Sequence, residues 1–236
     1  MRKTRAGVVT RVLAPCLAGR AGGANEERGE TRVRDNAITS NTPMQAYLSE
    51  NVFMGMVLST VEVYKKECFG LLLGYRTAEK YVVEHAIPYQ SVKRGHNFAE
   101  LRSDKWRLMQ EVLKHFPRLD VLGDYHSHTM YGDVRAEVSL SREDIEYMDP
   151  NDLQVVIAIN ENRRSRGWTV NTDRTMSGSL DRYHFKIAAY YDANRAGAHG
   201  VYRKVANGRP RARVAPRLKL ATIQCPFTLT PAARAL

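Results

Sequence analysis

The stretch GDYHSHTMYGDVRAEVSLSREDIEYM, residues 123–148, carries the most information about fold and function. It begins within an apolar run, LDVLGDYH, that predicts a β-strand, and it ends on SREDIEYM, whose serine and acidic first turn are typical of a helix N-terminus. Side chains alternate along a strand, so His126 and His128 point to the same face and their rings can reach one ion. The pair therefore suggests a metal site.

A third ligand is needed, because catalytic zinc sites usually use three protein ligands and keep the fourth position for water. Asp144, on the predicted helix after the loop, is one candidate, while Asp133 and Glu137 are nearer along the chain. Two surface histidines at a strand end are the alternative to a metal site, and spacing alone does not decide between the two.

The flanking residues predict the rest of one folded body. Residues 44–66 carry Phe53, Val57, Val61 and Tyr64 at helical spacing, which predicts a helix leading into Glu67. CFGLLLGYR and KYVVEHAIPYQ predict a hairpin, and residues 100–116 predict a second helix that ends at Pro117. Three further strands are predicted from LQVVIAIN, GWTVN and YHFKIAAYY, and YHFKIAAYY is the last strand expected. The fold class is α/β (α+β), with a mixed β-sheet flanked by helices in a single domain.

These residues together resemble a known family motif. HSH followed by Ser-x-x-Asp in SREDIEYM, with an acid upstream in ECFGLLLG, is similar to the JAMM motif of the MPN (JAB-type) zinc metalloprotease family. The resemblance covers about residues 44–191, including the order of helices and strands. The conjunction of four separated parts is far more specific than any single part.

The resemblance implies a role for each motif residue. His126, His128 and Asp144 would ligate Zn²⁺, Glu67 would act on the zinc-activated water, and Ser141 would help stabilise the oxyanion. It implies hydrolysis of a peptide or isopeptide bond, with conjugates of ubiquitin-like proteins as a substrate class. Considered without the rest of the motif, three of these residues have a simpler structural interpretation. Glu67 would be an exposed acid at a helix end, Ser141 a helix N-cap, and Asp144 an acid that interacts favourably with the helix dipole.

The chain departs from the family pattern at two places. Thr129 stands where the family usually has proline after the second histidine, and the spacing to the aspartate is about five residues longer than usual. Counting at the usual spacing ends on Ser139, but Ser139-x-x-Arg142 does not fit the motif, whereas Ser141 and Asp144 do. The extra length lies in TMYGDVRAEVSL, which is expected to form a loop at the mouth of the site.

The net charge of +11 is concentrated at the two ends of the chain. Residues 1–43 hold eight Lys/Arg and four Asp/Glu, residues 192–236 hold nine and one, and residues 44–191 hold nineteen and twenty. A near-neutral body makes a nucleic-acid-binding domain unlikely, and the ends are expected to be solvated tails. We therefore expect a disordered extension at 1–43, the metallopeptidase domain at 44–191 and a basic C-terminal extension at 192–236.

Cysteine use and hydropathy bear on location. Cys16, Cys68 and Cys225 lie far apart without CxxC spacing, which favours a reducing, cytoplasmic compartment. The chain has no apolar run of eighteen residues, and its start resembles a signal peptide except that Arg11 interrupts the apolar part. The main alternative function is a catalytically silent MPN scaffold that binds protein partners, and the sequence does not indicate an oligomeric state.

Overall fold

The computed structural model describes residues 43–91, 93–94, 99–100, 103–148, 151–193 and 217–226. The extension expected at residues 1–43 lies, except for its last residue, outside this part of the chain. The elements are β1 (Gln45–Leu48), α1 (Glu50–Glu62), β2 (Phe69–Arg76), β3 (Lys80–Pro88), β4 (Lys93–Arg94), β5 (Ala99–Glu100), α2 (Ser103–Leu113), β6 (Asp120–Thr129), α3 (Arg142–Tyr147), β7 (Leu153–Glu161), β8 (Thr169–Val170), β9 (Met176–Leu180), β10 (Tyr183–Asp192), β11 (Leu218–Leu220) and β12 (Thr222–Gln224).

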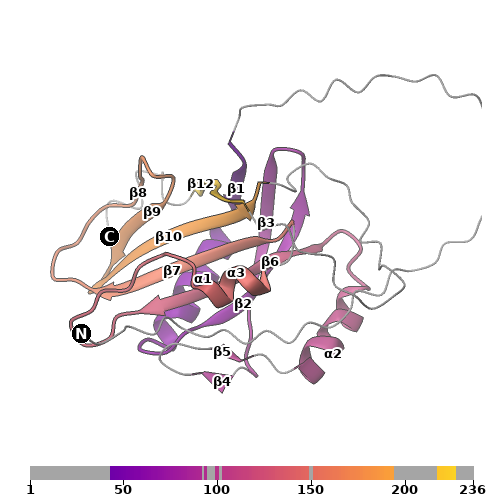
Figure 1. The fold of residues 1–236 in the computed structure, drawn as a ribbon, viewed down its shortest axis with the longest axis horizontal. Helices are drawn as coiled ribbons and strands as arrows, with labels where there is room; N and C mark the ends of the chain where they lie inside the picture. The colour runs from indigo at the N-terminus through magenta and orange to yellow at the C-terminus, as the bar shows by residue number, and fades with distance from the viewer. Residues whose placement is uncertain are drawn as a thin grey trace, which may run out of the picture.

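One ten-stranded mixed sheet organises the described residues (Figure 1). Its strand order is β12-β1-β3-β2-β6-β7-β10-β9-β8, and β11 pairs with β10. The β6–β7 pair is parallel, with α3 in the connection, whereas β2 pairs in antiparallel fashion with both β3 and β6. The α+β class and the predicted hairpin are confirmed.

The two faces of the sheet are covered differently. Alternate residues of β7 point to opposite faces, so Val155, Ile157 and Ile159 join the main core with α1. Val156 and Ala158 instead pack against the loop between β6 and α3, where Val138 is buried. Figure 1 shows α1 behind the sheet and α3 in front of it, so the second face is the one that carries α3.

The helix predicted from residue 44 begins later than expected. Ser49 is the N-cap of α1, with an extended backbone and a side-chain oxygen that accepts from the Val52 amide at 3.3 Å. The preceding residues form β1, which pairs in parallel with β3 and β12. The prediction of helix over residues 44–48 is wrong, because pairing with two strands distant in sequence determines the conformation there.

Besides β1, five strands were absent from the sequence interpretation: β4, β5, β9, β11 and β12. β9 pairs with β10, and residues 218–224, within the stretch expected to be a C-terminal extension, form β11 and β12. Ala221 and Ile223 are buried in the main core, so this short segment completes the sheet beside β1. Among the helices of the described residues, none is long and apolar enough to span a membrane.

Gly123 allows β6 to lie close against β7. Its φ is +142°, and a Cβ at this position would lie 2.1 Å from the Leu153 carbonyl oxygen. Leu153 is its partner in the parallel pairing, so neither backbone can withdraw without breaking the ladder. We expect Gly123→Ala to lower the free energy of unfolding by about 2–4 kcal/mol, measured by urea denaturation.

Gly167→Ala is the matched control for that substitution. Gly167 has no positive φ, and a Cβ there would meet no atom within 4 Å. We expect its free energy of unfolding to stay within about 0.5 kcal/mol of wild type. Equal stability of the two variants would contradict the close approach of β6 and β7.

Candidate metal centre

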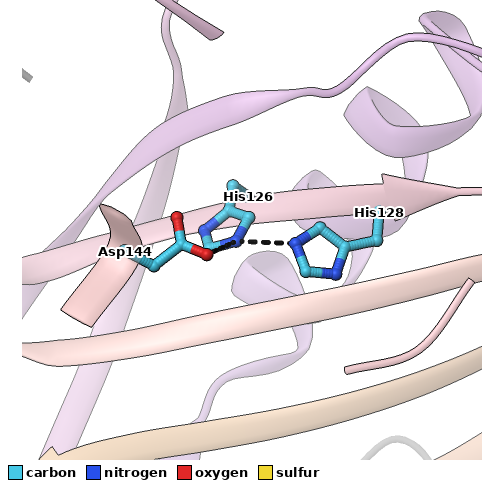
Figure 2. Close-up of side chains that lie close together, drawn as sticks. All are labelled: His126, His128 and Asp144. Atoms are coloured by element: carbon cyan, nitrogen blue, oxygen red, sulfur yellow. Dashed lines mark hydrogen bonds and ion pairs between the residues drawn. The ribbon is translucent and has the colours of Figure 1, made fainter. Parts of the chain in front are cut away.

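Three side chains with metal-ligating atoms meet on the face of the sheet that carries α3. His126 and His128, on β6, point to the same side, and their Nε2 atoms are 3.2 Å apart. Asp144, on α3, places its Oδ2 3.7 Å from His126 Nε2. Figure 2 shows the two rings side by side, with the carboxylate beyond His126. Ligand atoms of the three residues all lie within 4.8 Å of one another.

The start of α3 holds Asp144 in place. Ser141 is the N-cap, and its Oγ accepts from the Asp144 amide at 3.1 Å. Asp144 Oδ2 in turn accepts from the Ser141 amide at 2.7 Å, which completes a capping box. The side chain of Asp144 is therefore oriented by its own helix and is not free to turn into solvent.

The arrangement fits a tetrahedral metal ion such as zinc. Zinc–ligand bonds of 2.0–2.1 Å place neighbouring ligand atoms about 3.3 Å apart, close to the two distances observed. Asp144 Oδ1 is also buried without a hydrogen-bond partner, as expected of a carboxylate that faces a cation. Among the described residues no other group of three such side chains comes together.

A backbone carbonyl sets the tautomer of His128. Its Nδ1 lies 2.7 Å from the Glu137 carbonyl oxygen, which can only accept, so Nδ1 carries the proton and Nε2 keeps its lone pair. Burial, followed by the neighbouring His126, lowers the His128 pKa to about 4, and the ring is neutral near pH 7. Burial likewise lowers the pKa of His126, whose Nδ1 has no partner among the described residues.

Glu67 lies just before β2 and is only 3% exposed. Burial is the main cause that raises the pKa of its carboxyl to about 8, and the nearby Asp144 charge adds to the rise. Its Oε2 has no hydrogen-bond partner in the described structure. This position excludes the interpretation of Glu67 as an exposed acid at a helix end.

The other candidate ligands of the loop point elsewhere. Asp133 and Glu137 are both exposed, and Glu137 contributes its backbone carbonyl rather than its carboxylate. Ser141 does act as the N-cap, and the bond from the Asp144 amide to its Oγ leaves the hydroxyl hydrogen to donate elsewhere.

A family model described as prokaryotic homologs of the JAB domain matches residues 49–171, a range that includes all five motif residues. The chain belongs to this family. The expected MPN-type (JAB) domain is thereby confirmed. The solution structure of protein DSY2949 from Desulfitobacterium hafniense is similar at 15% identity, over 60% of this chain and 89% of that chain, with a TM-score of 0.41. No curated protein matches the chain.

Ser127 connects the two halves of the candidate centre in this JAB domain. Its Oγ accepts from the Cys68 amide at 2.9 Å, and its own amide donates to the Cys68 carbonyl at 3.2 Å. The residue after Glu67 is thus joined to the residue between the two histidines. The sequence interpretation missed this role, although the position of Ser127 within His-Ser-His was a usable signal.

Asn160 clamps the long loop of the JAB domain onto the sheet. Its buried side chain accepts from the Ala136 amide at 2.8 Å and donates to the Ala136 carbonyl at 3.2 Å. Ala136 precedes the carbonyl that holds His128, so the clamp supports the orientation of that ring. The Tyr190 hydroxyl adds a bond to the Val138 carbonyl at 3.1 Å.

Asn160→Ala should therefore leave both backbone groups of Ala136 without partners. We expect the free energy of unfolding to fall by about 1–3 kcal/mol and hydrogen exchange at the Ala136 amide to accelerate. Asn162→Ala is the control, because the hydrogen bonds of the Asn162 side chain join it only to the backbone of the nearby Arg164. Unchanged exchange at Ala136 in the Asn160 variant would contradict the clamp.

Proposed function

We propose that the chain is a zinc-dependent metallopeptidase that hydrolyses a peptide or isopeptide bond. The observation that carries the proposal is the buried group of His126, His128 and Asp144, with donor spacings that suit zinc. Membership of the JAB family supports it, since the motif implies a hydrolase of this type.

Glu67 is the proposed acid–base residue. When bound, zinc would supply a Lewis acid that lowers the pKa of a coordinated water and polarises the scissile carbonyl. The buried Glu67 carboxyl, with its raised pKa, can take a proton from the attacking water and return it to the leaving amine. A cation held by the three ligands would lower this pKa again and so favour the proton-accepting form.

Ser141 is the proposed oxyanion donor. Its oxygen caps α3, so the position of the hydroxyl is set by the helix that also carries Asp144. The hydroxyl hydrogen remains available to donate to the negative oxygen that develops on the carbonyl. Capping and catalysis are compatible uses of the same group.

The proposed substrates are polypeptides joined by an amide bond. Conjugates of ubiquitin-like proteins are the class that the motif implies, beside linear peptides. A cytoplasmic location is part of the proposal and is supported by the wide spacing of Cys16, Cys68 and Cys225, which forms no CxxC pair.

Metal analysis beside a cleavage panel tests the proposal. We expect about one zinc per chain in the wild type and cleavage of at least one isopeptide-linked or linear substrate. His126→Ala and Asp144→Asn should lose the metal, because two protein ligands hold zinc poorly. His85→Ala should retain it, because His85 is exposed and outside the group.

The competing function is a silent MPN scaffold that binds protein partners. A wild-type protein that contains no zinc and cannot be loaded with it would favour the scaffold and reject the peptidase. Zinc bound equally by wild type and His126→Ala would show that the metal sits elsewhere.

A further inference from the structure

An arginine-lined pocket lies beyond the metal centre, where β7 ends. This open pocket of about 450 Å³ is lined by Glu161, Asn162, Arg163, Arg164 and Arg182. Residues 161–164 belong to the end of β7 and the turn after it, and Arg182 precedes β10. The Asn162 amide donates to the Arg182 carbonyl at 2.8 Å, which joins the two segments. We call this feature the arginine pocket.

The arginine pocket has an excess of positive charge. Three arginines and one acid, Glu161, line the pocket, and all four residues are exposed. The adjacent Asp181 also attracts Arg182 electrostatically. None of the three arginines forms a salt bridge with a carboxylate of the described residues. Guanidinium groups present paired donors that match a carboxylate, so the pocket offers unpaired binding capacity for acidic side chains.

Arg182 is held in place before any ligand arrives. Its Nη2 donates to the Tyr183 hydroxyl at 2.9 Å, and its guanidinium lies 5.1 Å from the centre of the Tyr183 ring. The Tyr183 ring packs edge-on against Tyr64, with ring centres 4.9 Å apart. A guanidinium fixed in this way loses less conformational freedom on binding than a free surface arginine.

The arginine pocket adjoins both segments that build the metal centre. Tyr64, which contacts Tyr183, lies three residues before Glu67 in the chain. On the other side, the Glu161 amide donates to the Met130 sulfur at 3.4 Å, and Met130 follows His128 by two residues. The pocket thus lies at the same end of the sheet as the metal centre, but on the side that carries α1, because Glu161 follows the alternation of Ile157 and Ile159 and Tyr183 belongs to the main core.

The separation suits one extended polypeptide. Ala158 is the register partner of His128, and Glu161 follows it by three residues along β7. That interval is about 10 Å along a strand, and passing the end of β7 from the α3 side to the α1 side adds about another 10 Å, so about six residues of extended chain would reach from the metal ligands to the pocket.

Additional cations surround the same edge of the sheet. The Arg166 carbonyl accepts from the Ser179 amide at 2.9 Å, which places Arg166 beside β9. The charges of Arg166 and Arg135, after burial, lower the pKa of His184 on the neighbouring β10. Arg166 and Arg135 therefore add positive charge near β10 at this end of the sheet.

We propose that the arginine pocket binds an acidic segment of the polypeptide substrate that passes the end of β7, about six residues from the bond that is cleaved. This inference rests on the proposed function for the identity of the ligand as a substrate. Nucleic acid fits less well, because its binding requires a long row of phosphate contacts, whereas the pocket offers three arginines and the body of the chain is near neutral.

Peptide binding to the full-length protein tests the inference without requiring turnover. A fluorescent peptide of about ten residues with a short glutamate run is compared with the same peptide carrying glutamine, in the presence of EDTA. We expect the acidic peptide to bind at least about tenfold more tightly, with a difference that shrinks as salt rises from about 50 to about 300 mM. Arg163→Glu with Arg164→Glu should abolish the preference.

The control has the same change in charge elsewhere. Lys105→Glu with Arg107→Glu alters two exposed residues of α2, which lies at the opposite end of the molecule from β8 and β9 (Figure 1). The basic ends of the chain attract acidic peptides in every variant, so the difference between the two double variants is the measured quantity. Arg163→Gln with Arg164→Gln is the milder variant if the glutamates impair folding, and it should also reduce the preference.

Each result has a defined meaning. Equal losses in the pocket and control variants, or no preference in the wild type, would overturn the inference. An oligonucleotide that binds through the same arginines more tightly than the acidic peptide would also overturn it and indicate a nucleic-acid site. Because binding is measured without metal, absence of zinc or cleavage would reject the proposed function while leaving the acidic-peptide result to be judged separately.

Discussion

Glu67→Gln should lower kcat about 10²–10⁴-fold while zinc content stays at the wild-type level. Glutamine has nearly the same size and fills the same buried position, but its amide cannot accept and return a proton. The carboxyl of Glu67 is buried and its pKa is raised by burial and by Asp144, which is the environment expected of a proton-transferring group. KM should change little, because the loss falls on the transition state.

Glu62→Gln provides the matched control for this measurement. Glu62 is an exposed residue at the end of α1, and the same chemical change there should leave kcat and zinc content unaltered. The assay is steady-state cleavage of the best substrate from the panel, with metal content measured on the same preparations. Wild-type turnover in Glu67→Gln would reject Glu67 as the acid–base residue even if zinc binding and cleavage are established.

Glu67 should make the metal-free protein less stable as the pH rises from about 4.5 to about 8. Burial holds the Glu67 pKa at about 8, against 4.5 for the ordinary group. Between these values the unfolded chain releases the proton and the folded chain keeps it, so ionisation favours unfolding. The shift corresponds to a loss of about 3–5 kcal/mol that is complete above about pH 8.

His126 and His128 should make the metal-free protein less stable as the pH falls. Burial lowers the pKa of His126, and burial together with His126 lowers that of His128 from 6.5 to about 4. The unfolded chain therefore binds protons more readily, and stability falls as the pH drops below 6.5 toward 4. The two effects overlap between about pH 4.5 and 6.5, where the two histidines outweigh the single carboxyl, so the metal-free protein should be most stable near pH 6.5.

Urea denaturation with EDTA at a series of pH values tests both expectations. Glu67→Gln should remove the fall in stability that occurs as the pH rises to 8, and it should leave the fall in stability that occurs as the pH drops to 4. The exposed Glu62→Gln should follow the wild type at every pH. Zinc should stabilise the wild type at pH 8 by more than at pH 5, because the cation favours the ionised Glu67 and needs unprotonated ligands. If Glu67→Gln still loses stability as the pH rises to 8, another group must cause that loss.

Local patterns predicted the elements that build the centre. The alternation in LDVLGDYHSH placed both histidines on one face of a strand, and the serine with its acidic first turn correctly marked the start of α3. The β2–β3 hairpin followed from two apolar runs joined by polar residues. These predictions held because they depend on backbone geometry and capping within a few residues of each side chain.

Local patterns could not identify the strands that depend on distant partners. Residues 45–48 were included in the predicted helix, yet they pair with β3 and with a segment about 175 residues later in the chain. β11 and β12 are three residues each, too short for an apolar pattern to be recognised. Their conformation comes from hydrogen bonds that only the assembled sheet provides.

The candidate metal centre also combines features set by local sequence with features set by contacts between distant segments. The sequence by itself determined that two histidines share a face and that a capped, acidic helix follows, because these are properties of one strand and one helix turn. Only the tertiary structure decided that Asp144 joins the histidines while Asp133 and Glu137 remain exposed, that Glu67 is buried with a raised pKa, and that Asn160 holds the loop. Solvent exclusion, electrostatic coupling and clamping depend on distances between segments far apart in sequence, and packing of the whole sheet sets those distances.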